Sequence, residues 1–144
     1  MAKDFYHAHV KESLTQEGWE ITHDPFTITI KSTDYPIDLG AERLLAAEKG
    51  TEKIAIEIKS FLRDSVTNEF HTALGQFLNY RLGLQKLNIQ RRLFLVVPHS
   101  AYEKMQELPL ILMALETYQI DFFVYHTEQN TIELWKINSS NTKK

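Results

Sequence analysis

The sequence predicts an α/β fold with a mixed central sheet flanked by helices, and three neighbouring segments carry this prediction. From Glu52 to Ser60, isoleucines alternate with other residues, which is typical of a strand. From Ser65 to Lys86, apolar side chains recur at helical spacing, and Leu93 to Val97 is a continuous apolar run, as in a strand buried on both faces. A strand, a helix and a strand in this order form a βαβ unit.

The chain before this unit predicts one helix and three short strands. Tyr6, Val10 and Leu14 recur at four-residue spacing and form an apolar stripe, so a helix is expected there. The expected helix is 3–17, stopped by Gly18, and the expected strands are 19–23, 26–31 and 35–40. The third strand either runs on through residues 44–48 or is replaced there by a helix.

The chain after the unit predicts a further helix and a closing hairpin. Ser100 and Glu103 have the spacing of a capping box, so a helix is expected to open at Ser100, to be interrupted or reset at Pro109 and to continue to about Tyr118. The expected hairpin strands are 121–126 and 131–137. Four aromatic residues of this hairpin are expected to fill the core, with a partner surface as the alternative: Phe122, Phe123, Tyr125 and Trp135.

Composition and charge limit the class of protein. The length of 144 residues fits one domain, which we expect at residues 1–137, followed by a flexible tail at 138–144. There is no cysteine, so disulfides and cysteine zinc sites are excluded and a cytoplasmic location is expected. No run of about 18 apolar residues suggests a membrane span. The net charge of −3 counts against an extensive contact with nucleic acid, because affinity for phosphate depends on cationic side chains.

Three charged residues stand at positions where strands predict burial. Glu57 and Lys59 are two apart on the clearest strand, so they share a face, and Asp38 lies between apolar Ile37 and Leu39. If the two strands pair, two carboxylates and one ammonium meet, which is costly unless a cation neutralises them. Mg²⁺ or Mn²⁺ is the expected cation, with Lys59 orienting the attacking water or stabilising charge on a phosphate. The alternative is an exposed polar strand face.

Gln76 and Tyr80 add a second pattern on the following helix. They are four residues apart and therefore share a helix face beside the apolar stripe. One interpretation is a polar flank of an amphipathic helix. The other is that both side chains reach over the strand ends and help to set the site.

Taken in order, Asp38, Glu57, Lys59, Gln76 and Tyr80 resemble the PD-(D/E)xK pattern of the restriction-endonuclease-like superfamily, and the Gln-x-x-x-Tyr element is similar to that of RecB-type nucleases. Longer segments also resemble the XisH family of cyanobacterial fdxN-element excision controlling factors. The segments that carry this second resemblance are Trp19–Pro25, Ile37–Glu42, Ala55–Phe61 and Phe70–Phe77.

The resemblance implies an accessory factor that acts when a separate site-specific recombinase excises a DNA element, together with an XisI-type accessory protein. It implies Asp38 and Glu57 as metal ligands, Lys59 as the catalytic lysine, and Gln76 and Tyr80 as auxiliary residues. Two functions stay open: a magnesium-dependent nuclease-type site for phosphodiester hydrolysis, or a non-catalytic interaction module that acts through the XisI-type partner. DNA is an expected ligand, a membrane is not, and assembly into a homo-oligomer is left open.

Two details of the resemblance concern the motif itself. The residue before Asp38 is Ile37, and the proline is Pro36, one position earlier than the motif name implies. Many relatives also carry a glutamate on the first helix; Glu12 is the available candidate, and we leave it out of the predicted site.

Other candidate residues are histidines and arginines. His7 and His9 are two apart on a predicted helix, so they cannot form the zinc pair that four-residue spacing provides. We expect all six histidines to be structural: His7, His9, His23, His71, His99 and His126. The candidate phosphate contacts, weighed against solvated surface charge, are Arg63, Arg91 and Arg92.

Overall fold

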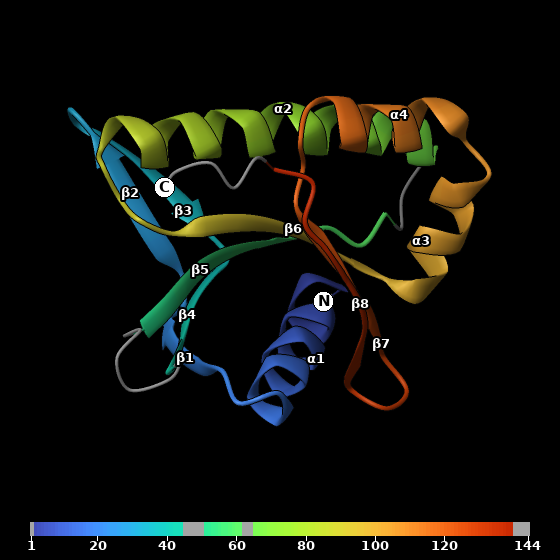
Figure 1. Cartoon of the computed structure of the whole chain (residues 1–144), viewed down its shortest axis with the longest axis horizontal. Coiled ribbons are helices and arrows are strands. Elements are labelled where there is room, and N and C mark those ends of the chain that lie inside the picture. Colours follow the sequence, from blue (N-terminus) through green and yellow to red (C-terminus); the bar gives the residue numbers. More distant parts are fainter. Residues whose placement is uncertain (1, 45–50, 62–64, 140–144) are drawn as a thin grey trace.

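The computed structural model describes residues 2–44, 51–61 and 65–139 and shows a mixed central sheet with helices on both faces (Figure 1). The helices are α1 (Ala2–Gln16), α2 (Val66–Lys86), α3 (His99–Gln106) and α4 (Pro109–Thr117). The first strands are β1 (Glu20–His23), β2 (Phe26–Ile30), β3 (Thr33–Ile37) and β4 (Leu39–Leu44). The remaining strands are β5 (Thr51–Ile58), β6 (Arg92–Pro98), β7 (Phe122–His126) and β8 (Thr131–Lys136).

The described sheet is mixed, as the sequence predicted. Its six strands follow the order β1-β4-β5-β6-β7-β8, while β2 and β3 form a separate two-stranded sheet. The pairs β5–β6 and β6–β7 are parallel, and β1–β4, β4–β5 and β7–β8 are antiparallel. The parallel strands β5 and β6 are joined through α2, which is the βαβ unit that the sequence indicated.

Each face of the sheet has its own core. In Figure 1, α1 lies against one face, while α2 and α4 lie against the other. Strand β5 serves both cores because its side chains alternate: Ile54 and Ile56 pack with α1 residues, whereas Ala55 packs with the α2 side. Glu57 follows Ile56 and continues this alternation, so its side chain is directed to the α2 face.

The first helix ends as its sequence predicts. Gly18 has φ of 91°, a conformation that glycine adopts without steric cost. The Gly18 N–H donates to Thr15 O at 3.0 Å, and the Trp19 N–H donates to Leu14 O at 3.1 Å. These two bonds form a Schellman motif, which satisfies the last carbonyls of α1 and turns the chain into β1.

The capping box expected at Ser100 is wrong. Helix α3 begins one residue earlier, at His99, with Pro98 at the cap position and no side-chain cap bond. Glu103 instead lies one helical turn after His99, with its Oε2 at 3.2 Å from His99 Nε2. An ion pair between positions i and i+4 therefore replaces the expected bond between Glu103 and the backbone.

The strand expected at 35–40 is two strands separated by a bend at Asp38. Ile37 pairs with Phe26 in the small β2–β3 sheet, while Leu39 pairs with Ile56 in the main sheet. Asp38 is therefore the residue at which the chain passes from one sheet to the other. The two alternatives for residues 44–48 fall largely on positions 45–50, which lie outside the described residues.

The closing hairpin forms, and its aromatic residues fill the core as predicted. Phe122, Phe123 and Tyr125 are buried, and Trp135 packs partly buried against the α1-side core. Trp135 stacks on Trp19 with 6.0 Å between ring centroids and donates its indole N–H to Glu17 Oε1 at 3.1 Å. The aromatic cluster thus ties β8 to the end of α1.

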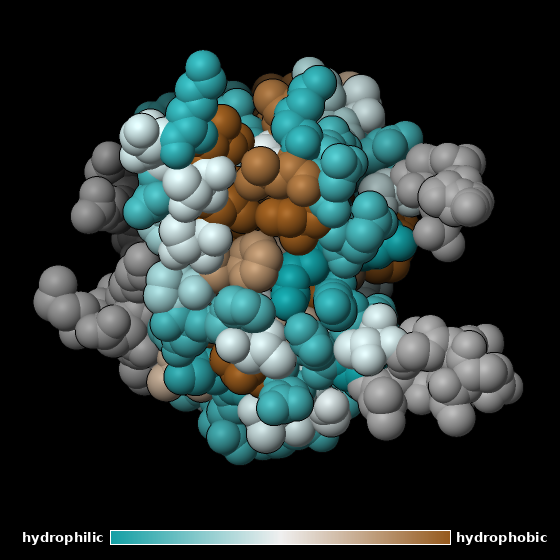
Figure 2. Space-filling view, turned by 90° about the vertical axis from the view of Figure 1, so that its left-hand side faces the viewer, coloured by the Kyte–Doolittle hydropathy of each residue, from teal (hydrophilic) through white to brown (hydrophobic). Residues whose placement is uncertain are grey.

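Figure 2 shows the face on which β2, β3 and the end of α2 lie, with apolar side chains gathered in its upper half among hydrophilic ones. The apolar side chains of Ile30, Leu82 and Leu87 are exposed on these elements. Strand β2 packs closely on α2 at Gly83, where an added Cβ would lie 2.7 Å from Ile28 Cδ1.

No helix in the described part of the chain is long and apolar enough to cross a membrane.

A buried carboxylate holds the chain beyond β8. Asp121 is 3% exposed, and its Oδ1 accepts from the backbone N–H groups of Asn138 and Ser139, both at 2.8 Å. Its Oδ2 accepts from the Ser139 hydroxyl at 2.7 Å and from Arg92 Nη1 at 3.1 Å. The first two residues of the expected tail are therefore bonded to the sheet, and residues 140–144 lie outside the described chain.

Replacing Asp121 by alanine is expected to lower the free energy of unfolding by about 3 kcal/mol, because Arg92 and two backbone N–H groups lose a charged acceptor. Urea denaturation measures this change. Glu116→Ala, at an exposed position on α4, is the control and should change the free energy by no more than about 0.5 kcal/mol. Equal effects of the two substitutions would contradict the anchoring role of Asp121.

Candidate functional site

The pairing of β4 with β5 places Asp38 opposite Glu57. Leu39 and Ile56 are paired in this antiparallel ladder, so the next position outward brings Asp38 beside Glu57 on the same face. The Asp38 N–H donates to Glu57 Oε1 at 3.3 Å, and the Ile58 N–H donates to Asp38 Oδ2 at 2.8 Å. The carboxylate of Glu57 thus accepts a backbone hydrogen bond from Asp38. The carboxylate of Asp38 accepts one from the end of β5, the strand that carries Glu57.

Both carboxylates are buried, Asp38 at 7% and Glu57 at 5% exposure. Burial away from water, together with the negative charge of Asp38, raises the pKa of Glu57 to about 7, while Lys59 opposes the rise. Two like charges in a buried place repel, so a proton or a cation is needed to relieve them. The site is therefore built to hold positive charge.

Lys59 and the α2 residues form a chain of contacts across this site. Lys59 Nζ lies 3.4 Å from Glu57 Oε2 and donates to Gln76 Oε1, and Gln76 Nε2 donates to the Tyr80 hydroxyl at 3.2 Å. Burial and the negative charge of Glu57 raise the pKa of Tyr80, which keeps its phenol protonated. The lysine is therefore held between β5 and α2 by a carboxylate on one side and an amide on the other.

The five residues predicted from the sequence line one pocket of about 630 Å³. The wall of this pocket is completed by Tyr6 from α1, by Pro36 from β3 and by residues of the first turns of α2. Phe61 also lines it, with φ of 56°, a strained conformation for a bulky residue that turns the chain away after β5. The structure therefore brings the predicted residues together; their chemical roles stay a prediction.

Glu69 is a lining residue that the sequence analysis missed. It lies in the first turn of α2, where an acidic side chain complements the helix dipole. Its Oε2 is buried and has no hydrogen-bond partner among the residues that the structure describes, which is costly for a carboxylate oxygen. Its spacing in the sequence could have identified it. Glu69 precedes Gln76 by seven residues, which is two helical turns, so the two residues share a helix face.

A divalent cation fits this set of donors. Asp38, Glu57 and Glu69 offer carboxylate oxygens to one pocket, and one of these oxygens is an orphaned buried acceptor. Hard cations such as Mg²⁺ prefer oxygen ligands, and one or two carboxylates suffice when water and substrate supply the rest. The donor chemistry is therefore consistent with Mg²⁺ or Mn²⁺, as the sequence predicted.

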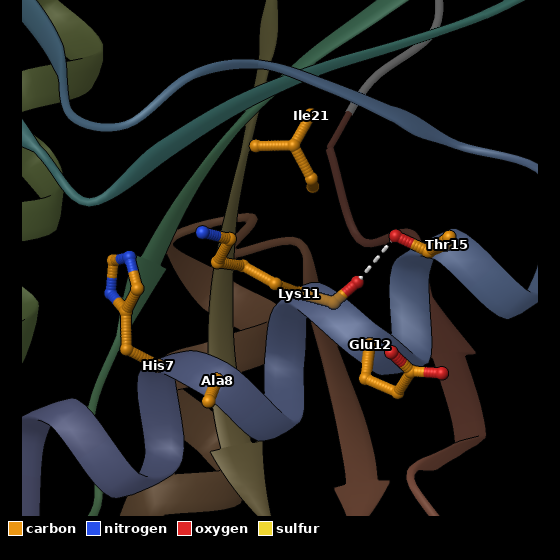
Figure 3. A pocket seen from close by; sticks show the side chains of 6 residues that line it. All are labelled: His7, Ala8, Lys11, Glu12, Thr15 and Ile21. Carbon is orange, nitrogen blue, oxygen red and sulfur yellow. Dashed lines mark hydrogen bonds between the residues drawn. The ribbon is translucent and has the colours of Figure 1, made fainter.

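The glutamate of the first helix lies elsewhere. Figure 3 shows Glu12 at a separate depression of about 450 Å³, which is lined by α1 residues such as His7, Lys11 and Thr15 and by Ile21 of β1. His7 and Lys11 are both bound to Asp24, at 2.7 and 2.8 Å. Glu12 does not line the pocket of Asp38 and Glu57. Tyr6 is the residue that α1 contributes to the pocket.

Two of the candidate phosphate contacts are used inside the fold. Arg91 donates to the carbonyl of Ile54 and pairs with Glu42 at 3.0 Å, and its side chain is only 6% exposed. Arg92 is bound to Asp121. Arg63 lies outside the described residues. Arg91 and Arg92 therefore form contacts within the fold and do not line the pocket of Asp38 and Glu57.

Comparison with known proteins gives one family and two close structures. The sequence matches the family described as XisH protein over residues 1–133. An XisH family protein from Nostoc punctiforme PCC 73102 is 41% identical, with a TM-score of 0.82, and the match covers 93% of this chain and 99% of that one. An fdxN element excision controlling factor protein from Anabaena variabilis is also 41% identical, with a TM-score of 0.82 and coverage of 92% and 98%. No curated protein matches.

The raised pKa of Glu57 predicts a pH dependence of stability. Folding favours the protonated carboxyl, so the folded chain keeps a proton that the unfolded chain releases between pH 4.5 and 7. Without metal, stability should therefore fall as pH rises through this window, by about 3 kcal/mol in total. Glu57→Gln removes this dependence, so the variant should gain on the wild type as pH rises.

Urea denaturation in the presence of a chelator, at a series of pH values, measures this difference. Glu116→Gln, exposed on α4, is the matched control and should give a difference from wild type that stays flat with pH. A flat difference for Glu57→Gln as well would show that Glu57 ionises normally in the folded protein.

Proposed function

This chain belongs to the XisH family, and from this premise we propose that it controls the excision of a DNA element from a genome. The support is the similarity to an fdxN element excision controlling factor protein, which extends over 92% of this chain. Under this proposal the chain acts on DNA beside a site-specific recombinase and an XisI-type accessory protein.

The proposed site for this function is nuclease-like. We assign the fold to the restriction-endonuclease-like superfamily because the mixed sheet presents Asp38, Glu57 and Lys59 at one strand end. The observation that carries the assignment is the buried pair of opposed carboxylates with a lysine 3.4 Å from Glu57 Oε2. Two apolar side chains at these positions would stabilise the fold at a lower free-energy cost, so stability alone does not explain the charged pair.

In this proposal Asp38 and Glu57 hold Mg²⁺ or Mn²⁺, and Glu69, whose buried Oε2 has no partner among the described residues, adds a third acidic group. The bound ion supplies Lewis-acid polarisation of a phosphate oxygen. Lys59 presents a positive charge at the same place, where negative charge develops on a phosphodiester during hydrolysis. Gln76 positions the Lys59 ammonium, and the protonated Tyr80 hydroxyl can donate to a ligand in the pocket.

A second candidate function is a non-catalytic interaction module of the same fold, acting through the XisI-type partner. The specific observation in its favour is charge. The chain carries a net charge of −3, and Arg91 and Arg92 are bound to Glu42 and Asp121. These arginines contribute little to a phosphate-binding surface, which a nuclease acting alone on long DNA requires.

Cleavage of supercoiled and branched DNA with Mg²⁺ or Mn²⁺ distinguishes the two functions. If the site is catalytic, Glu57→Ala and Lys59→Ala should each lower the cleavage rate by about 100-fold or more. Lys53→Ala, exposed on the same strand, should leave the rate unchanged. Activity that survives both substitutions, or is absent from the wild type, would remove the nuclease proposal and leave the interaction module.

Metal binding can be tested without activity. Mg²⁺ at ten times its dissociation constant should stabilise the wild type by about 1.4 kcal/mol, and thermal unfolding with and without Mg²⁺ measures this. Glu57→Gln should abolish the stabilisation and Glu69→Gln should weaken it. Glu12→Gln, in the separate depression on α1, should behave as the wild type. The proposed metal site is wrong if Glu57→Gln responds to Mg²⁺ as the wild type does.

A further inference from the structure

A second group of metal-binding side chains lies at the ends of the last three strands, apart from the pocket already described. His99 follows β6, His126 ends β7 and Glu133 lies in β8. One ligand atom from each of the three residues lies within 4.8 Å of the other two. The start of α3 lies beside the β7–β8 hairpin in Figure 1, so the end of β6 meets two strands that lie more than 20 residues further along the chain.

The two histidines are brought together by parallel pairing. Pro98 pairs with Tyr125, so the residues that follow, His99 and His126, leave adjacent strands at the same edge of the sheet. Their imidazole rings stack, with 4.4 Å between centroids and 26° between planes. Histidine side chains from neighbouring parallel strand ends are thus fixed next to each other by the backbone.

A β-bulge directs Glu133 toward them. Along β8, Leu134 pairs with Val124 and Ile132 pairs with Tyr125, which leaves Glu133 between them without a partner on β7. A bulge of this kind reorients the side chain of the extra residue, and bulges are frequent beside functional sites. Glu133 Oε1 lies 2.6 Å from His99 Nδ1 and 3.1 Å from His126 Nε2.

We propose that His99, His126 and Glu133 form a binding site for a transition-metal cation, with Zn²⁺ as the expected ion. Two imidazole nitrogens and one carboxylate oxygen are the protein ligands of many open zinc sites. Ligand atoms of a tetrahedral zinc site are separated by about 3.3 Å, as bonds of about 2.0–2.1 Å require. The two separations that involve Glu133 Oε1, 2.6 and 3.1 Å, are shorter than this value, and all three ligand atoms lie within 4.8 Å of one another, so binding would widen the contacts of Glu133.

A second carboxylate, that of Glu103, supports this assignment. Glu103 Oε2 lies 3.2 Å from His99 Nε2, the ring nitrogen that faces away from Glu133. Histidines that bind metals commonly donate this second N–H to a carboxylate, which fixes the tautomer and makes the other nitrogen a better ligand. His99 Nδ1 and Glu133 Oε1 form a hydrogen bond of 2.6 Å, and a bound cation would take the place of this bond.

The donor set separates this site from the pocket of Asp38 and Glu57. Imidazole nitrogens suit zinc, nickel and copper, whereas a pocket of carboxylates suits magnesium and manganese. Three protein ligands also leave one tetrahedral position for water or another ligand. The side chains of His99 and His126 are about one-third exposed, at 35% and 37%, so this position is open to solvent.

The test is titration of the full, tag-free chain with Zn²⁺ by calorimetry, in excess Mg²⁺ to occupy the carboxylate pocket. The wild type should bind one Zn²⁺ per chain, and His126→Gln and Glu133→Gln should each weaken binding by about 100-fold or more. Glu103→Gln should weaken it by about tenfold. His23→Gln, an exposed histidine outside the group, is the matched control and should bind as the wild type does.

Substitution with Co²⁺ gives a second readout, because a tetrahedral site containing nitrogen ligands produces visible absorption that an octahedral surface site does not. Circular dichroism checks that each variant is folded. No Zn²⁺ bound by the wild type, or equal binding by the wild type and both ligand variants, would overturn the proposal and leave the group as an ion-pair cluster. Loss of binding in His23→Gln would also overturn it.

Discussion

The register of β4 on β5 is the constraint on which the described site depends. It sets two carboxylates, Asp38 and Glu57, opposite each other on a buried face, where like charges destabilise a sheet. The pair persists because each carboxylate accepts a backbone N–H from the other strand end. These two bonds satisfy one oxygen of each carboxylate but do not neutralise their negative charge, which Lys59 Nζ, 3.4 Å from Glu57 Oε2, partly offsets.

The parallel strands explain why chemistry gathers at one edge of the sheet. Because β5, β6 and β7 run in the same direction, their carboxyl ends lie at a common edge. Glu57 and Lys59 stand at the end of β5, and His99 and His126 at the ends of β6 and β7. Oxygen donors thus lie toward α2 and imidazole donors toward the β7–β8 hairpin, so one sheet edge presents two donor sets of different metal preference.

Local rules accounted for most of the elements and failed where two local signals competed. The alternation of β5 correctly put Glu57 and Lys59 on one face, and four-residue spacing correctly put Gln76 and Tyr80 on one side of α2. The capping box at Ser100 failed because Pro98 already starts the helix and Glu103 binds His99 instead. Glu69 was missed because an acidic residue in a first helical turn is ordinary, and only burial makes it unusual.

Periodicity predicted the α/β class and the central strands, and it put Glu57 with Lys59 and Gln76 with Tyr80 on shared faces, because strand and helix periods decide which side chains share a face. The choice of these four residues and Asp38 as one site also rested on the family resemblance. Three features required the tertiary structure. The bend at Asp38 depends on which sheet each neighbour joins, the unpartnered oxygen of Glu69 on what surrounds it, and the approach of Glu133 to two histidines on a bulge in β8. Each depends on contacts with another segment of the chain, and a periodic pattern within one segment contains no information about its partner.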